Sequence, residues 1–248
     1  MSHVTLVDDL EAEQRALADV VHGLVDDAWL TPTPSWGWDV RDTIAHLADT
    51  DEVALDTMTG GPRSLGALAL VCASPEDVTY LGVLKGRRRA GDEVLAWWER
   101  AASEERAALR ALAPDVRVPW GLGMAPRSFV TARLMETWAH GLDVRAALGV
   151  PSPDTARLRH VAWLAVRALP YAYARAGRDA PAGDLRVELD GPDGARVELG
   201  APDAPNRITG DLGDLCRVFV QRLPADGARL HADGDAAVAA LEVARAFL

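Results

Sequence analysis

Two different hydrophobic periodicities divide the chain near Pro151. Before this proline, apolar side chains recur at helical spacing in long segments that are separated by loops containing proline and glycine. After it, short segments alternate apolar and polar residues, as half-buried strands do, between further helical stretches. The sequence therefore predicts an α+β protein, in which a four-helix bundle (residues 1–150) precedes a small α+β domain (residues 151–248).

Four long helices are expected in the first domain. Asp39 is a good N-cap for the second of them, and Asp42 at the third helical position is favoured by the helix dipole. Residues 59–90 are rich in glycine and contain one short apolar piece, so we expect them to be irregular. A loop is expected over residues 114–126. The helices are predicted at Leu6–Trp29, Asp39–Met58, Asp92–Leu112 and Arg127–Leu148.

The second domain is expected to combine a small sheet with helices. A hairpin is predicted because two alternating segments flank the turn residues Gly191–Gly194. An exposed edge of the sheet would allow a homodimer to form. The predicted elements are a helix over Thr155–Ala176 kinked at Pro170, strands at Leu185–Leu189, Ala195–Leu199, Arg207–Thr209 and Ala228–His231, a helix over Asp211–Gln221 and a final helix from Asp235.

Charge and hydropathy exclude several classes of partner. The formal net charge of −11 argues against nucleic acid, and we interpret the one basic cluster, Lys85–Arg89, as a solvated loop. No apolar run reaches the length of a membrane span, and the N-terminus lacks the features of a signal peptide. Cys72 and Cys216 form no paired motif and are expected to be buried free thiols. These observations predict a cytoplasmic protein that binds neither nucleic acid nor membrane.

Three residues on two predicted helices could hold a divalent metal. Glu136 and His140 are four residues apart and share one helix face, and His46 lies on a second helix that can pack against the first. Two imidazoles and one carboxylate leave coordination positions open, as in catalytic sites. Asp49 and Asp143 each follow a histidine by three positions and could orient it. The alternative is a core in which those aspartates simply hydrogen-bond the two histidines.

Two segments resemble the signature helices of the DinB-like metal-binding superfamily, Trp38–Leu47 and Thr131–Val144. More narrowly, the chain is similar to the branch that contains mycothiol-dependent maleylpyruvate isomerase, and the similarity continues over residues 155–161, 185–199 and 208–222. The resemblance implies a DinB-like four-helix bundle. It also implies a divalent metal, usually zinc, held by His46, Glu136 and His140, and mycothiol as the thiol cofactor.

Two further residues are candidates for the site. In the resembled family an arginine of the C-terminal domain contributes to the active site, and Arg222 is the position that matches. The planar guanidinium group of Arg222 can hold a substrate carboxylate through two parallel hydrogen bonds, although a surface ion pair is an equally good interpretation. Trp120, in the loop before the fourth helix, could form a wall of the pocket that binds the cofactor, although packing also explains it.

These expectations describe a metal-dependent enzyme acting on a small electrophilic molecule. A metal-bound thiol is largely deprotonated and is a good nucleophile, so an S-transferase or a cis–trans isomerase is the leading hypothesis. Three alternatives stay open. A metal-activated water would make a hydrolase or lyase, with Asp49 or Asp143 as base. The same ligands match a non-haem iron site, and a non-catalytic metal- or ligand-binding protein would also fit.

Overall fold

The computed structural model describes residues 3–121 and 123–246, and the chain divides into two compact units, Met1–Ser152 and Pro153–Leu248. The α+β fold and its N-terminal four-helix bundle are confirmed. Over the part of the chain that the structure describes, no helix combines the length and the apolar character needed to cross a membrane.

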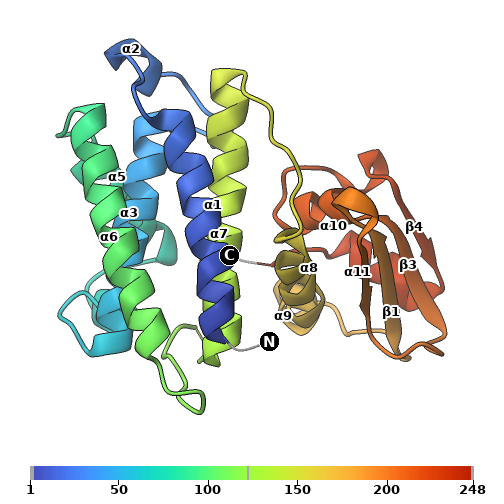
Figure 1. The fold of residues 1–248 in the computed structure, drawn as a ribbon. Helices are drawn as coiled ribbons and strands as arrows, with labels where there is room; N and C mark the ends of the chain where they lie inside the picture. Colours follow the sequence, from blue (N-terminus) through green and yellow to red (C-terminus); the bar gives the residue numbers. More distant parts are fainter. Residues whose placement is uncertain (1–2, 122, 247–248) are drawn as a thin grey trace. The chain divides into compact units, whose positions relative to one another are not determined.

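Four long helices form the bundle of the first unit and run side by side in Figure 1. The helices α3 and α1 each pack against both α6 and α7, which closes the bundle. Shorter helices occupy the connections. The elements are α1 (His3–Val21), α2 (Asp26–Trp29), α3 (Val40–Thr59), α4 (Leu65–Leu68), α5 (Pro75–Gly86), α6 (Gly91–Ala111) and α7 (Pro126–Leu148).

Local signals in the sequence define the ends of α3. The Asp39 carboxylate accepts a 2.7 Å hydrogen bond from the Asp42 amide, and the Asp42 carboxylate accepts a 3.4 Å bond from the Asp39 amide. This reciprocal capping box satisfies amides that the first turn leaves without helical partners. The helix ends at Gly60, whose φ of 77° is costly for a residue with a Cβ. The residues at the start of α3, the helix that carries His46, therefore determine where that helix begins.

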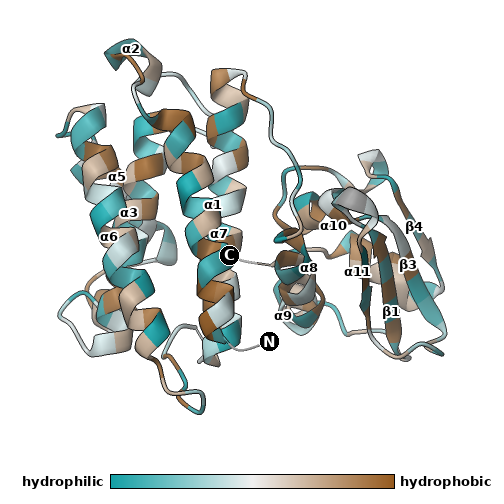
Figure 2. Cartoon of the chain, viewed as in Figure 1, coloured by the Kyte–Doolittle hydropathy of each residue, from teal (hydrophilic) through white to brown (hydrophobic). Residues whose placement is uncertain are grey.

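Apolar side chains from every long helix fill the interior of the bundle. Figure 2 shows hydrophobic and hydrophilic residues mixed along each of these helices, as expected when one face is buried. Burying a Leu, Ile or Phe side chain contributes about 1.5–3 kcal/mol. The largest side chains that are almost completely buried in this unit are Trp98, Phe129, Leu6, Leu10, Leu17, Ile44, Leu47, Leu109 and Leu134.

The expectation that residues 59–90 are irregular was wrong, because this segment contains α4 and the twelve-residue α5. Ser74 caps α5 by accepting a 3.2 Å hydrogen bond from the Asp77 amide, and Pro75 occupies the first turn. The glycines that made this segment look irregular in the sequence permit close packing of the helix against α3. A Cβ on Gly82 would lie 2.7 Å from the Asp49 Cβ, and one on Gly86 would lie 2.3 Å from the Ala45 Cβ. The backbone of α5 therefore rests directly on α3.

The basic cluster is not the solvated loop that we expected. Lys85 donates a 2.6 Å hydrogen bond to Asp49, and Arg87 binds both carboxylate oxygens of Asp42. The Arg89 guanidinium lies 4.6 Å from the centre of the Trp97 ring, a cation–π contact. Three of these cations thus attach the end of α5 to the bundle.

The first predicted helix is shorter than expected. It ends at Val21 and is followed by the separate α2, because Gly23 adopts a left-handed conformation with a φ of 73°. The expectation for the two cysteines was half right, since Cys216 is buried whereas Cys72 is partly exposed.

The second unit packs helices with a four-stranded sheet of order β2-β1-β3-β4. The predicted hairpin is present as the antiparallel pair β1–β2, while β1 and β3 are parallel. The predicted helix over residues 155–176 is two helices, since Pro170 cannot donate a backbone hydrogen bond. The elements are α8 (Leu158–Arg167), α9 (Leu169–Ala176), β1 (Leu185–Asp190), β2 (Arg196–Leu199), β3 (Asn206–Asp211), α10 (Leu212–Phe219), β4 (Leu230–Asp233) and α11 (Asp235–Glu242), with 3-10 turns at Pro192–Gly194 and Ala225–Gly227.

Candidate metal centre

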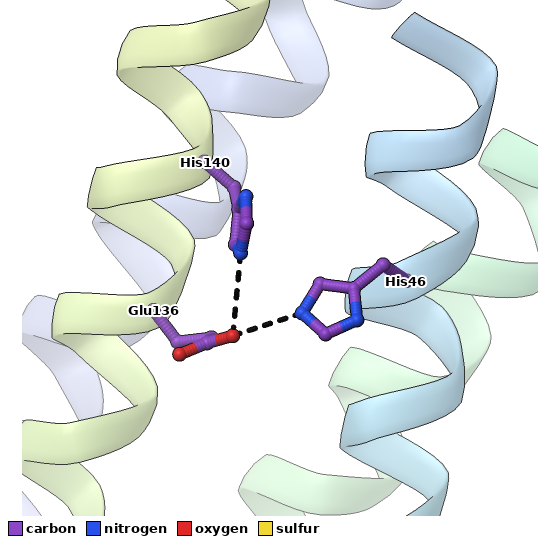
Figure 3. Close-up of side chains that lie close together, drawn as sticks. All are labelled: His46, Glu136 and His140. Atoms are coloured by element: carbon purple, nitrogen blue, oxygen red, sulfur yellow. Dashed lines mark hydrogen bonds and ion pairs between the residues drawn. The ribbon is translucent and has the colours of Figure 1, made fainter. Parts of the chain in front are cut away.

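Three polar side chains converge between α3 and α7, as Figure 3 shows. The Nε2 atoms of His46 and His140 lie 2.9 Å and 3.3 Å from the same carboxylate oxygen, Oε1 of Glu136. The one-turn spacing of Glu136 and His140 on α7 places both side chains on the face that meets His46 on α3. The sequence-predicted triad therefore forms one compact cluster.

The geometry of this triad fits a divalent metal. The potential ligand atoms of the three residues all lie within 4.8 Å of one another. Bonds of about 2.0–2.1 Å at tetrahedral angles would separate neighbouring ligand atoms by about 3.3 Å, so a small rearrangement of the side chains would admit zinc. Nitrogen and carboxylate donors suit zinc and also other first-row metals. Three protein donors leave at least one position for a further ligand.

The second nitrogen of each imidazole faces an oxygen atom. The Nδ1 atom of His140 lies 3.4 Å from Oδ2 of Asp143, and Nδ1 of His46 lies 3.4 Å from the Thr50 hydroxyl. The Thr50 hydroxyl donates its proton to the His46 carbonyl at 2.6 Å, which leaves its oxygen free to accept from Nδ1. A proton on Nδ1 leaves the lone pair on Nε2, where a metal would bind.

Asp49 does not orient His46, contrary to one expectation from the sequence. Its carboxylate instead accepts hydrogen bonds from Arg63 at 2.7 Å and Lys85 at 2.6 Å. Both cations contact the same oxygen of Asp49, Oδ1. Thr50, which follows His46 by one turn, takes the position expected for Asp49.

Burial and mutual hydrogen bonding set the charges of the triad. Burial by itself would raise the pKa of Glu136, but hydrogen bonds from His140 and His46 outweigh it and hold that pKa well below its ordinary value. Burial lowers the pKa of His46. Burial also opposes the charged form of His140, yet Asp143 and Glu136 together raise the pKa of this histidine. The cluster therefore holds an ionised carboxylate, a neutral imidazole and an imidazole that retains a proton readily.

Trp38 covers the two imidazoles. Its ring centre lies 5.1 Å from that of His46 and 5.9 Å from that of His140, nearly parallel to the latter at 24°. The loop that carries Trp38 is attached to α7, because the Ser35 hydroxyl donates a 3.0 Å hydrogen bond to Asp143. The Glu136 side chain keeps 22% of its surface exposed, against 7% for His46 and 13% for His140. Access to the cluster is therefore greatest at the carboxylate.

The other two predicted site residues lie in different parts of the fold. Trp120 is half-buried in the loop before α7 and packs its ring on Phe129, at 5.4 Å between centres, two turns before Glu136. Arg222 belongs to the second unit, where it follows α10 and donates a 2.7 Å hydrogen bond to the Val220 carbonyl. Their roles in a site stay predictions.

Sequence reasoning missed Trp38 and a buried ionic cluster beside the triad. Arg133, three residues before Glu136, donates to Asp51 of α3 at 2.5 Å and to Glu105 of α6 at 2.8 Å. All three side chains of this cluster are at most 4% exposed. One signal was available for Trp38, because it directly precedes the N-cap of the helix that carries His46.

Comparison with known proteins agrees with these features. Residues 10–145 match a family model described as the mycothiol maleylpyruvate isomerase N-terminal domain. Two uncharacterized proteins of Mycobacterium tuberculosis, MT0041 and Rv0036c, are each 37% identical to the chain over 242 residues, which cover 97% of this chain and 94% of theirs.

Two solved structures share the fold. They are mycothiol-dependent maleylpyruvate isomerase and a His-to-Ala mutant of it, with TM-scores of 0.61 and 0.62, 17% identity and coverage of 92% of either chain. The resemblance seen in the sequence is thereby confirmed. The family model covers more than half of the chain, and the protein belongs to the mycothiol maleylpyruvate isomerase N-terminal domain family.

Proposed function

We propose that the protein is a metal-dependent enzyme that uses a thiol, mycothiol, to act on a small electrophilic molecule as an S-transferase or a cis–trans isomerase. The observation that carries the proposal is the convergence of His46, Glu136 and His140 on one point between two helices. The description of the matching family and the identity of the two solved structures support mycothiol as the thiol.

Each residue of the triad has a distinct task in this proposal. His46 and His140 would bind a divalent metal, most plausibly zinc, through Nε2, and Glu136 would bind it through Oε1. A metal held there would lower the pKa of a coordinated thiol and so supply a thiolate at neutral pH. Asp143 and Thr50 hold the imidazoles in the required orientation, and Trp38 limits the access of water.

The thiol would react by addition and elimination. Addition of the thiolate to an electron-poor double bond forms a C–S bond and moves the π-electron pair onto the conjugated carbonyl oxygen. Rotation about the former double bond, followed by cleavage of the C–S bond, returns the electron pair, regenerates the double bond and releases the thiol as a net isomerisation. If another group leaves instead, the C–S bond remains and the result is S-transfer.

Two residues complete the proposal outside the triad. The Arg222 guanidinium would bind a carboxylate of the substrate through paired hydrogen bonds. The Trp120 ring would form part of the wall that contacts the cofactor. The role of Arg222 extends from the family resemblance and that of Trp120 from its place in the loop before α7, and each has a direct test in the corresponding variant, Arg222→Met or Trp120→Leu.

The deciding experiment is to measure the metal content of the purified protein beside His140→Ala, followed by mycothiol titration of the Co²⁺-substituted form. We expect about one metal per chain in the wild type, loss of it in the variant, and a thiolate-to-cobalt absorption band on addition of mycothiol. His22→Ala, which changes a histidine of the turn after α1, is the control and should retain the metal.

Other outcomes redirect the proposal. Metal that is present but does not respond to mycothiol would favour the hydrolase or lyase interpretation, in which water takes the open position. Absence of metal from the wild type, even after incubation with Zn²⁺ or Co²⁺, would mean that the three residues only form hydrogen bonds with one another in the core.

A further inference from the structure

The triad is accompanied by a second connection between the same two helices. Arg133 precedes Glu136 by one turn on α7, and Asp51 follows His46 by five residues on α3. The pairs Arg133–Asp51 and Glu136–His46 join the helices at successive levels, so α3 and α7 run antiparallel here. The position of α3 along α7 decides whether His46 reaches the carboxylate of Glu136. Arg133 and Asp51 form an ion pair across the same two helices, one level away from that contact.

The ionic connection also includes α6. The Nε and Nη2 atoms on one edge of the Arg133 guanidinium donate to Glu105 and Asp51 respectively. Trp98, two turns before Glu105 on α6, donates a 3.1 Å hydrogen bond from its indole nitrogen to the second oxygen of Asp51. Three helices therefore meet at one guanidinium directly beside the triad.

Ionising both carboxyl groups on one edge of the guanidinium would cost considerable free energy. They lie side by side, away from water, with a single positive charge between them. Burial raises the pKa of Asp51, and the hydrogen bonds that this carboxylate accepts from Arg133 and Trp98 oppose the rise. Burial and the neighbouring Asp51 carboxylate raise the pKa of Glu105 well above its ordinary value. With one proton on Glu105, the cluster is electrically neutral.

A contribution to folding stability does not by itself explain why the protein has such a buried ionic cluster. Replacing a buried ion pair by apolar side chains of similar volume is often neutral or stabilising, whereas a directional pair specifies register. We propose that Arg133 and Asp51 are positioning residues of the metal centre, which hold α3 and α7 in the register that brings His46 to Glu136, with Glu105 of α6 as the second partner of Arg133. This inference rests on the metal-binding function proposed above.

The test compares two isosteric variants at the two carboxyl groups. Asp51→Asn removes the negative charge that Arg133 requires, whereas Glu105→Gln replaces a neutral carboxylic acid by a neutral amide that can still accept from Nε. We expect Asp51→Asn to weaken Co²⁺ binding by about tenfold or more and to shift the visible ligand-field bands of the bound Co²⁺. Glu105→Gln should retain both the affinity and the spectrum.

A matched control separates positioning from general destabilisation. Leu109→Ala creates a cavity on α6, one turn beyond Glu105, without removing an ionic group, and should lower the unfolding temperature while leaving the Co²⁺ spectrum unchanged. If Asp51→Asn does not fold, Trp98→Phe supplies a second variant, with Leu109→Ala as the control for the buried volume that it also loses. Trp98→Phe keeps the Asp51–Arg133 pair and removes the indole donor to Asp51. It should shift the bands in a folded protein.

The outcomes distinguish this inference from the function on which it rests. Failure of the wild type to bind Co²⁺ would remove the proposed metal centre itself. A wild type that binds Co²⁺, together with a folded Asp51→Asn or Trp98→Phe variant of unchanged affinity and spectrum, would overturn the positioning role alone. Equal losses in Asp51→Asn and Glu105→Gln would overturn the assignment of the proton to Glu105.

Discussion

Asp143 lies one turn beyond His140 on α7 and places its Oδ2 atom 3.4 Å from Nδ1 of that imidazole. The aspartate is itself held, because Ser35 donates a hydrogen bond to the same oxygen. An acceptor at Nδ1 fixes the tautomer and raises the basicity of the opposite nitrogen. In the proposed metal centre, Asp143 would therefore favour Nε2 of His140 as the ligand atom.

Substitution of this acceptor should weaken metal binding. Asp143→Asn keeps the size of the side chain but removes its charge, and we expect the affinity for Zn²⁺ to fall about 10- to 100-fold. Competition with a chromophoric chelator measures the change. Asp190→Asn, at an exposed carboxylate of the second unit, is the control and should match the wild type. Equal affinities in all three proteins would contradict the role of Asp143.

The charge of His140 predicts a pH dependence with a definite sign. Its pKa in the folded protein is raised, so in the metal-free protein it contributes stability that is present below about pH 6.5 and is lost as the pH rises through that raised pKa. His46, whose pKa burial lowers, is already neutral in this window. Metal must displace the His140 proton, so apparent metal affinity should increase over the same pH range.

Thermal unfolding of the metal-stripped protein against pH checks this expectation, with metal titrations at the same pH values. His140→Gln should remove the stability change above pH 6.5 that belongs to the imidazole. Identical pH profiles for the variant and the wild type would show that the proton resides elsewhere.

The contact of α5 with α3 predicts a strong effect at one glycine. A Cβ on Gly82 would lie 2.7 Å from the Asp49 Cβ and 3.3 Å from the His46 Cα, so Gly82→Ala must push the helices apart at the turn that carries His46. We expect a destabilisation of about 1–3 kcal/mol and weaker metal binding. Denaturant unfolding and metal titration measure the two effects. Gly66→Ala on α4, where a Cβ meets no atom within 4 Å, should cause neither.

The proton assigned to Glu105 predicts how stability changes with pH. Because burial and Asp51 raise the pKa of Glu105, its contribution to stability is complete below about pH 4.5 and is lost as the pH rises toward its folded pKa. Arg133 of α7, Asp51 of α3 and the Gln14 amide of α1 face this carboxyl group. Glu105→Gln should therefore gain stability relative to the wild type as the pH increases.

Urea unfolding at several pH values measures that difference. Glu242→Gln, at an exposed carboxylate that pairs with Arg178, should show no comparable trend. A constant difference between Glu105→Gln and the wild type at all pH values would mean that Glu105 is ionised in the folded protein.

Local patterns were sufficient to predict the helices of the bundle and the pairing of Glu136 with His140, whereas the addition of His46 to this pair relied on the family resemblance. The spacing of Glu136 and His140 already specifies one helix face, and Asp39 with Asp42 specifies where the helix of His46 begins. These features depend on residues near one another in the chain, so they can be recognised in the sequence without knowledge of the tertiary fold.

The errors arose where long-range packing overrides local preference. Gly82 and Gly86 lower helix propensity, yet α5 forms because they let its backbone reach α3. The partners of Asp49 were missed for the same reason, since Arg63 and Lys85 both lie in the segment expected to be irregular. Arg133 gave no local signal, because a charged residue in a helical pattern usually faces solvent.

Glu136 is the only carboxylate among the three converging side chains, so a bound dication would keep one unit of positive charge, +2 − 1. The whole chain, Glu136 included, has a formal net charge of −11. Electrostatic potential focused at such a point attracts small anions that reach it, while the surrounding surface repels extended polyanions. With a metal bound as proposed, the single carboxylate among its ligands would favour compact anionic molecules before any shape-dependent contact is made.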